Sequence, residues 1–219
     1  MQFNVQINRE WDQENFESFW KLDNPTIKRV YPWIKSKQDI ETLFASEYDS
    51  RKILAIAGWF LGEDHILRQI ADALSDVIQE DWQGHEIIDI YVGVCPVCPR
   101  YINGDTFWVY YGGTANDMRR LCAHEMAHFL YFKKLKTLLH QDDLDVEQPG
   151  YEWLLSEILN VPIINDQRIQ DIVHDQEQGY FFSAGVPDSI AQKVQAMWHP
   201  DKMLEIHQQA HTLLQPYIH

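Results

Sequence analysis

The sequence predicts an α+β fold, in which a small mixed sheet is combined with several amphipathic helices. Apolar residues recur at helical spacing over residues 65–81 and 117–139. Between these two stretches, residues 86–94 and 106–111 are rich in β-branched and aromatic side chains, which favour strands. The chain has 219 residues, of which 45% are hydrophobic, so it can bury a core. We therefore expect a globular protein rather than a disordered one.

The N-terminal part is expected to supply one strand and several helices. Residues 1–8 alternate between apolar and polar side chains, as a short strand does. Aromatic side chains are frequent over residues 11–33, and we expect them to serve in packing rather than in a ligand cage. Helices are predicted over residues 36–45 and 51–60, and the helix at 65–81 carries its apolar residues on one face.

The two strands in the middle of the chain are expected to pair antiparallel across the loop between them. That loop contains Cys95 and Cys98, whose spacing also occurs in zinc and redox sites. A structural zinc ion needs four ligands, and the third cysteine, Cys122, falls inside a predicted helix. We therefore expect a tight turn without chemistry, with a local disulfide or metal site as the alternative.

The residues that carry chemistry lie in the predicted helix at 117–139. His124 and His128 are four residues apart, so their imidazoles project from one face of the helix. Neutral imidazole nitrogen binds zinc, and a catalytic zinc site takes three protein ligands and leaves a position for water. Glu125, next to the first histidine, is placed to accept a proton from that water. The pattern predicts a metal site with a general base.

The surroundings of this motif strengthen the prediction. Thr114 and Asp117 have the pattern of a helix start, a hydroxyl cap followed three residues later by an acid. No Gly or Pro interrupts residues 117–139, and apolar side chains recur there at helical spacing. The two histidines therefore lie within a largely apolar helix, where polar side chains without a partner would be costly.

The run His124-Glu125-Met126-Ala127-His128 resembles the motif of the zincin metallopeptidases. In that superfamily the histidines bind zinc, the glutamate is the general base, and a third ligand follows later in the chain. The metzincin branch would need a glycine and a histidine where this chain has Tyr131 and Lys134, so the resemblance is to the gluzincin branch, which takes a glutamate from a second helix. It implies a zincin-like fold, with a backing helix at 65–81, an edge strand that holds the substrate, an active-site helix and a second ligand helix.

The second helix is expected over residues 151–160, and acids in or near it compete for the role of third ligand. Glu157 falls within the most apolar stripe of that helix, where a carboxylate needs a strong partner. Glu152 lies about 140° round the helix from Glu157, near the helix start, where the helix dipole already favours an acid. We predict Glu157, with Glu152 as the alternative and Glu147 as a more distant one. The acid common in gluzincins four residues after the third ligand would fall on Val161.

Peptidases of this kind also need a hydrogen-bond donor for the oxyanion, often a Tyr or His supplied from beyond the third ligand. Tyr180 and His174 are the candidates in this chain, although core packing would account for Tyr180 equally well. We expect residues 161–166 to end the second ligand helix and to lead into a polar segment at 166–178.

Three sections of the chain are expected. Residues 1–112 would hold the N-terminal helices and the sheet, residues 113–165 the metal-binding helices, and residues 166–219 a helical C-terminal part. No internal repeat or low-complexity region indicates another organisation. We expect the three sections to form one compact unit.

Charge and composition limit the partners. A net charge of −15 disfavours nucleic acid and anionic membranes, because a phosphate-binding surface needs a basic excess. No stretch has the length and apolarity of a bilayer span, and the first residues do not look like a signal peptide. Three cysteines, an odd number, do not suggest a disulfide framework, so a cytoplasmic location is expected. The sequence leaves the oligomeric state open.

The sequence thus predicts a zinc-dependent metallopeptidase that acts on a peptide or protein substrate. His124, His128 and Glu157 would bind Zn²⁺, Glu125 would act as general base, and Tyr180 would stabilise the oxyanion. The alternative is a binding or regulatory module of the same fold, which holds zinc with little or no turnover. The presence of Glu125 favours the enzyme, because a purely structural metal site has no use for a base.

Overall fold

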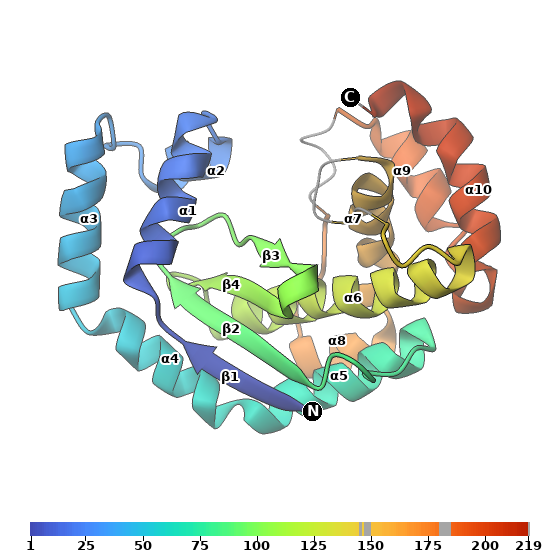
Figure 1. Ribbon diagram of the computed structural model, residues 1–219, viewed down its shortest axis with the longest axis horizontal. Helices are drawn as coiled ribbons and strands as arrows, with labels where there is room; N and C mark the ends of the chain where they lie inside the picture. The colour runs from blue at the N-terminus through green and yellow to red at the C-terminus, as the bar shows by residue number, and fades with distance from the viewer. Residues whose placement is uncertain (145, 147–149, 180–184, 219) are drawn as a thin grey trace. The chain divides into compact units, whose positions relative to one another are not determined.

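The computed structural model describes residues 1–144, 146, 150–179 and 185–218, and it confirms an α+β fold with a small mixed sheet. The strands are β1 (Gln2–Gln6), β2 (Ile87–Gly93), β3 (Arg100–Tyr101) and β4 (Thr106–Tyr110). The α-helices are α1 (Arg9–Lys21), α2 (Pro25–Val30), α3 (Lys37–Asp49), α4 (Lys52–Gly62), α5 (Asp64–Ile78), α6 (Ala115–Leu139), α7 (Tyr151–Ile164), α8 (Gln167–Val173), α9 (Asp188–Gln195) and α10 (Met203–Leu214) (Figure 1). Short 3₁₀ helices are η1 (Ile102–Gly104), η3 (Pro200–Lys202) and η4 (Gln215–Tyr217). Over the described ranges, no helix combines the length and the apolar character that a bilayer span requires.

The chain forms two compact units. The first, here called the sheet unit, comprises Met1–Leu67 and Glu86–Met118, and the second, the helical unit, comprises Arg68–His85 and Arg119–His219. The sequence-based sections divided the chain at 112 and 165. The structure instead places the residues on both sides of 165 in one unit, because α7 packs against both α9 and α10.

The sheet has the strand order β1-β2-β4-β3 (Figure 1). β1 and β2 are parallel, β2 and β4 are parallel, and β3 and β4 are antiparallel. The expected antiparallel pairing of residues 86–94 with 106–111 is therefore wrong. The chain reverses direction twice, first in the loop between β2 and β3 and again at η1 between β3 and β4, so β4 enters the sheet with the same direction as β2.

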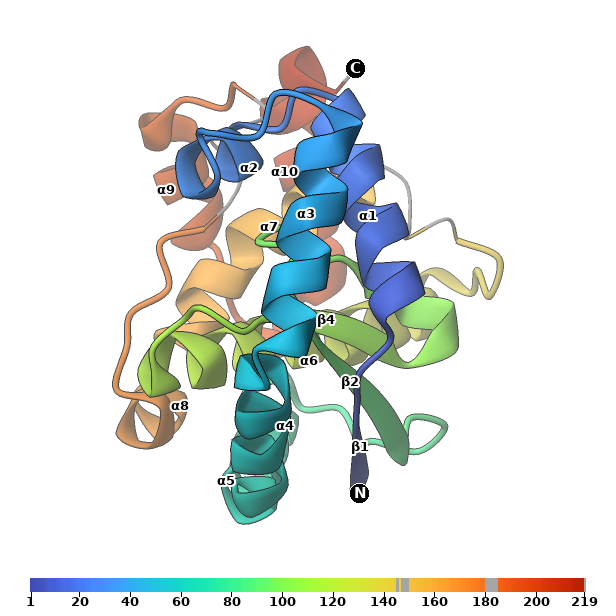
Figure 2. The ribbon, with the colours of Figure 1, turned by 90° about the vertical axis from the view of Figure 1, so that its left-hand side faces the viewer.

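The two faces of the sheet differ in character. One face carries apolar side chains, among them Ile88, Ile90 and Phe107, and all three are buried. On the other face Tyr91 stacks on Trp108, and Trp11 of α1 packs edge-on against both rings. The aromatic residues near the N-terminus are thus packing residues, as expected. Helix α1 in turn packs against α3, and Figure 2 shows the two helices side by side.

Asp12 fixes α1 to the end of β2. Its buried carboxylate accepts hydrogen bonds from the backbone N–H of Val94 at 2.6 Å, from that of Cys95 at 3.2 Å and from the Tyr48 hydroxyl at 2.8 Å. Burial raises the pKa of Asp12 to about 6, although these hydrogen bonds favour the ionised form. Cys95 and Cys98 are free thiols. The start of their loop is thus held by a carboxylate rather than by a disulfide.

The helices that carry the metal motif begin and end for local reasons. Thr114 and Asp117 cap α6 as predicted, since the Thr114 N–H donates to Asp117 at 2.9 Å and the Asp117 N–H donates to the Thr114 hydroxyl at 3.2 Å. Helix α7 ends at Ile164 with Asn165 as its C-cap, within the residues 161–166 that were expected to end it. Pro162 lies in the last turn, where it removes only one hydrogen bond of a helix that the surrounding packing already holds.

Two glycine substitutions test the packing of Asp12. A Cβ on Gly93 would lie 2.4 Å from the Asp12 carboxylate, which three hydrogen bonds hold in place. Gly93→Ala should therefore lower the free energy of unfolding by about 1–3 kcal/mol in urea titrations. As a control, Gly58→Ala in α4 meets no atom within 4 Å and should raise the stability by about 0.5–1 kcal/mol. Equal stability of Gly93→Ala and wild type would contradict the position of Asp12.

Candidate metal centre

His124 and His128 meet at the middle of α6. They are one turn apart, and their side chains are buried, with exposed fractions of 1% and 0%. Their Nε2 atoms lie 3.2 Å apart, and the two rings are arranged edge to face with centroids 4.9 Å apart. The helical spacing in the sequence therefore brings two nitrogen atoms to one point inside the protein.

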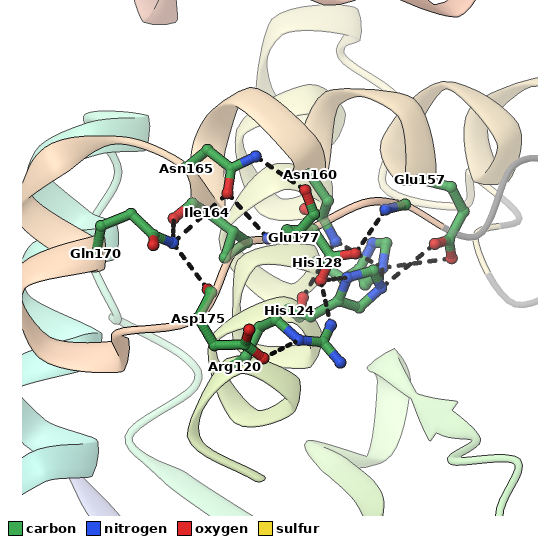
Figure 3. Close-up of polar contacts among 11 residues, drawn as sticks. Arg120, His124, His128, Glu157, Asn160, Ile164, Asn165, Gln170, Asp175 and Glu177 are labelled. Carbon is green, nitrogen blue, oxygen red and sulfur yellow. Dashed lines mark hydrogen bonds and ion pairs between the residues drawn. The ribbon is translucent and has the colours of Figure 1, made fainter. Parts of the chain in front are cut away.

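The third member of the cluster is Glu157 of α7. Its carboxylate lies 3.3 Å from His124 Nε2 and 3.4 Å from His128 Nε2, and the residue is 3% exposed. Figure 3 shows both imidazoles directed at this carboxylate. Glu152, the alternative third ligand, lies 3.6 Å from His207 Nε2 and does not belong to the cluster. Glu147 falls outside the described residues.

These three residues have the spacing of metal ligands. A tetrahedral zinc ion with ligand atoms at about 2.0–2.1 Å separates any two of them by about 3.3 Å. The two Nε2 atoms lie 3.2 Å apart, and they lie 3.3 and 3.4 Å from the two different oxygens of the Glu157 carboxylate. Two neutral imidazoles and one carboxylate are also a donor set that divalent transition metals accept. The buried cluster of His124, His128 and Glu157 could therefore hold a metal ion.

Glu177 contacts the other side of the His124 ring. Its Oε2 lies 3.3 Å from His124 Nδ1 and accepts a hydrogen bond of 2.6 Å from Arg120 Nη1, while its Oε1 accepts one of 2.7 Å from the Gly179 N–H. Arg120 also donates to Asp175 at 3.0 Å, as Figure 3 shows. A carboxylate at Nδ1 fixes the tautomer and the angle of the ring, so that Nε2 faces Glu157.

The segment that carries Glu177 is held by side-chain amides of the helices before it. The Asn165 amide donates to the Glu177 carbonyl and accepts from the Glu177 N–H, both at 2.9 Å. Gln170 donates to the carbonyls of Ile164 and Asp175, at 2.9 and 3.0 Å. Because these bonds are buried or partly buried, they hold the carboxylate in position against His124.

Sequence reasoning missed Arg120 and Glu177. Residues 166–178 were expected only to be polar, yet they contain α8 and the buried Glu177. One signal was available, because Arg120, His124 and His128 follow one another at intervals of four residues on the same face of α6. An arginine on the ligand face of a helix indicates a nearby carboxylate, but not which one.

The charges of His124 and Glu177 are coupled. Burial alone would lower the pKa of His124, but its contacts with Glu157 and Glu177 raise that pKa to about 10. Burial would raise the pKa of Glu177, but the contact with His124 and the charge of Arg120 lower that pKa to about 2. The site thus favours a positive charge at His124. A metal dication supplies positive charge at the same place and competes with the proton for the nitrogen lone pair.

Asn160 joins the two ligand helices and was also missed. It lies one turn after Glu157 on α7 and is fully buried. Its Nδ2 donates to the main-chain carbonyl of His124 at 3.2 Å and lies 2.9 Å from His128 Nε2. The contact fixes the register of α7 against α6, so that Glu157 faces both histidines.

The remaining residues of the predicted site have different outcomes. Glu125 is buried, 4% exposed, and its charge contributes to the raised pKa of His124, but it does not belong to the ligand cluster. His174 ends α8 in the left-handed conformation and is exposed, so it does not lie in the cluster. Tyr180 falls outside the described residues. Of the two predicted oxyanion donors, only His174 is described and it lies outside the cluster, and the role of Glu125 as a base stays a prediction.

Metal binding separates the two candidate third ligands. Wild-type protein should take up one Zn²⁺, and a zinc concentration of 100 Kd should raise the free energy of unfolding by about 2.7 kcal/mol. Glu157→Gln should lose most of this gain, because it removes a ligand, whereas Glu152→Gln should keep it. Thermal unfolding with and without zinc, beside metal analysis of the purified proteins, measures both. A loss of zinc in Glu152→Gln alone would reverse the assignment.

The role of Glu177 can be measured in the same way. Glu177→Gln should weaken zinc affinity by about 10–100-fold, because it replaces a charged partner of a ligand histidine. Asp175→Asn is the matched control, since Asp175 pairs with the same Arg120. Competition with a chromophoric chelator gives both affinities. Equal losses in the two variants would show that Arg120 and the segment matter, rather than the contact with His124.

Comparison of the chain with protein-family models, with curated proteins and with solved structures finds no significant match. What the structure gives is an α+β fold and a buried cluster of two histidines and one glutamate that could hold a metal ion. The resemblance of residues 124–128 to the zincin motif therefore stays a prediction from the sequence.

Proposed function

We propose that the protein is a zinc-dependent metallopeptidase of the zincin type. One observation carries the proposal: the Nε2 atoms of His124 and His128 lie 3.2 Å apart, and each lies within 3.3–3.4 Å of an oxygen of the buried Glu157 carboxylate, so the three residues could hold a metal ion. Glu125 follows the first of these histidines, as the general base of such a site does. The metal would be zinc, for which two imidazoles and one carboxylate are a common ligand set in hydrolases.

The residues divide the chemistry between them. A bound zinc ion supplies Lewis acidity and lowers the pKa of water toward about 7. Glu125 accepts the proton of the attacking water and returns it to the amine that leaves. His124, His128 and Glu157 would hold the ion and leave room for water, and Glu177 lies 3.3 Å from His124 Nδ1, where it orients the ring.

Composition supports a peptide substrate in a reducing compartment. The net charge of −15 disfavours nucleic acid and anionic lipid and is compatible with basic peptides. Cys95, Cys98 and Cys122 are free thiols, and free thiols persist in the cytoplasm. We therefore propose a cytoplasmic peptidase.

A second candidate function has one observation in its favour. The exposed fractions of His124, His128 and Glu157 are 1%, 0% and 3%, and closed sites of this kind are typical of structural metal ions. On this reading the fold is a binding or regulatory module that holds zinc with little or no turnover. Glu125 favours the peptidase, because it directly follows the first ligand histidine, where the zincin motif has its general base.

The two candidates separate in one assay. Purified protein with one equivalent of zinc is incubated with a diverse peptide library, beside Glu125→Gln, and the products are read by mass spectrometry. Wild type should cleave, and the substitution should lower the rate by about 10²–10⁴-fold because it removes the base while keeping the metal. Glu152→Gln is the control for loss of an acid on the neighbouring helix. Cleavage that persists in Glu125→Gln would contradict the role of Glu125 as general base. A zinc-loaded protein without cleavage would favour the binding module.

A further inference from the structure

Asn160 occupies a special place beside the metal cluster. It is three residues after Glu157, so both side chains project from the same face of α7. Both are buried, with exposed fractions of 0% and 3%. A carboxamide in such a place is either a tie between helices or a group that acts on what the cluster binds. Its contacts decide between the two.

The orientation of the Asn160 amide follows from its first contact. The main-chain oxygen of His124 lies 3.2 Å from Asn160 Nδ2, and a carbonyl oxygen can only accept. The nitrogen end of the amide must therefore face α6. One of its two N–H bonds is then used by His124, which leaves the second for another acceptor.

The second N–H of Asn160 is the informative one. Asn160 Nδ2 lies 2.9 Å from His128 Nε2, and this Nε2 is the atom with which His128 would bind the metal ion. A nitrogen that gives its lone pair to a metal ion cannot also accept a hydrogen bond. With the ion bound, this N–H therefore needs a different acceptor close to the metal centre, and a buried donor without one is unfavourable.

We propose that Asn160 donates a hydrogen bond to the oxygen of the substrate carbonyl as negative charge develops on it. The inference rests on the proposed function and names a residue of the same site. It assigns the role of oxyanion donor to a residue of α7, whereas Tyr180 and His174, which lie farther along the chain, were predicted for it. Among the other buried polar residues of α7, Ser156 donates to the carbonyl of Trp153 and so is used within its own helix.

The reaction balances with this assignment. The water oxygen bonds to the carbonyl carbon, its proton moves to Glu125, and the π electrons of the carbonyl move onto its oxygen. The Asn160 N–H stabilises the charge on that oxygen. The bond between carbon and nitrogen then breaks, and the proton held by Glu125 passes to the nitrogen. Water and an amide become a carboxylic acid and an amine, with no other reactant.

Two small zinc ligands test the donor apart from activity. Acetohydroxamate binds zinc through oxygen atoms that accept hydrogen bonds, whereas 2-mercaptoethanol binds through a sulfur that accepts them weakly. Their affinities are measured in competition on the zinc-loaded full chain, in wild type, Asn160→Ala and Ser156→Ala. Asn160→Ala should keep its zinc, bind acetohydroxamate about tenfold more weakly and bind the thiol as wild type does. Ser156→Ala should leave both affinities unchanged.

The turnover of the same proteins gives the second measurement. Asn160→Ala should lower kcat by about 10²–10³-fold with little change in KM, because the donor acts on charge that appears only in the transition state. Should the alanine variant fail to fold, Asn160→Asp takes its place, since it keeps the shape. Its added charge repels both anionic ligands, so the ratio of the two affinities still reports the lost donor.

The possible results are distinct. A loss of zinc from folded Asn160→Ala, or an equal change in both affinities, would overturn the proposal and leave Asn160 as a tie between helices. An unchanged ratio in both variants would overturn it as well. A wild-type protein that takes up no zinc would refute the proposed function before either ligand is added, and a zinc-loaded protein that binds both ligands but cleaves nothing would refute only the peptidase.

Discussion

The need to satisfy polar groups buried between α6 and α7 governs the helical unit. His124, His128 and Glu157 are almost wholly removed from water, and most of the buried residues around them on α6 and α7 are apolar. Isolated groups of this kind are costly to bury, and they become acceptable when they bind one another or a shared ion. The convergence of these three side chains is therefore the reason why the two helices pack with this register.

Other parts of the helical unit serve that convergence. Asn160 ties α7 to the backbone of α6, and Glu177 holds the far side of the His124 ring. Arg120 neutralises the carboxylate of Glu177, and Asn165 fixes the backbone on which that residue stands. Helix α8 and the segment after it thus help to orient His124, which is distant in the sequence. Their contribution is orientation, which decides how strongly a histidine binds a metal.

Burial also bears on what the site can do. A dry surrounding strengthens the electrostatic interactions of Glu125 and Glu157 with the two histidines. The same burial keeps reactants out unless a part of the chain moves, so ligand geometry and turnover are separate properties of this protein. Glu125 is buried, and its charge contributes to the raised pKa of His124, which is compatible with the base that we propose.

What the sequence by itself determined is local. Three features could be predicted from short stretches of sequence: the interval between His124 and His128, the cap at Thr114, and the apolar stripe that favoured Glu157 over Glu152. Each depends only on residues within a few positions of one another in a single helix. The short strands and most helices were predictable for the same reason.

Only the tertiary structure decided the rest. The parallel pairing of β2 with β4 depends on how the loop between them turns back through β3, which no hydrophobic period encodes. Glu177 reaches His124 from 53 positions away, and Asn160 meets His128 from a different helix. Periodicity places side chains on a face of their own element, whereas the partner across the interface is chosen by packing, and packing is a property of the whole chain.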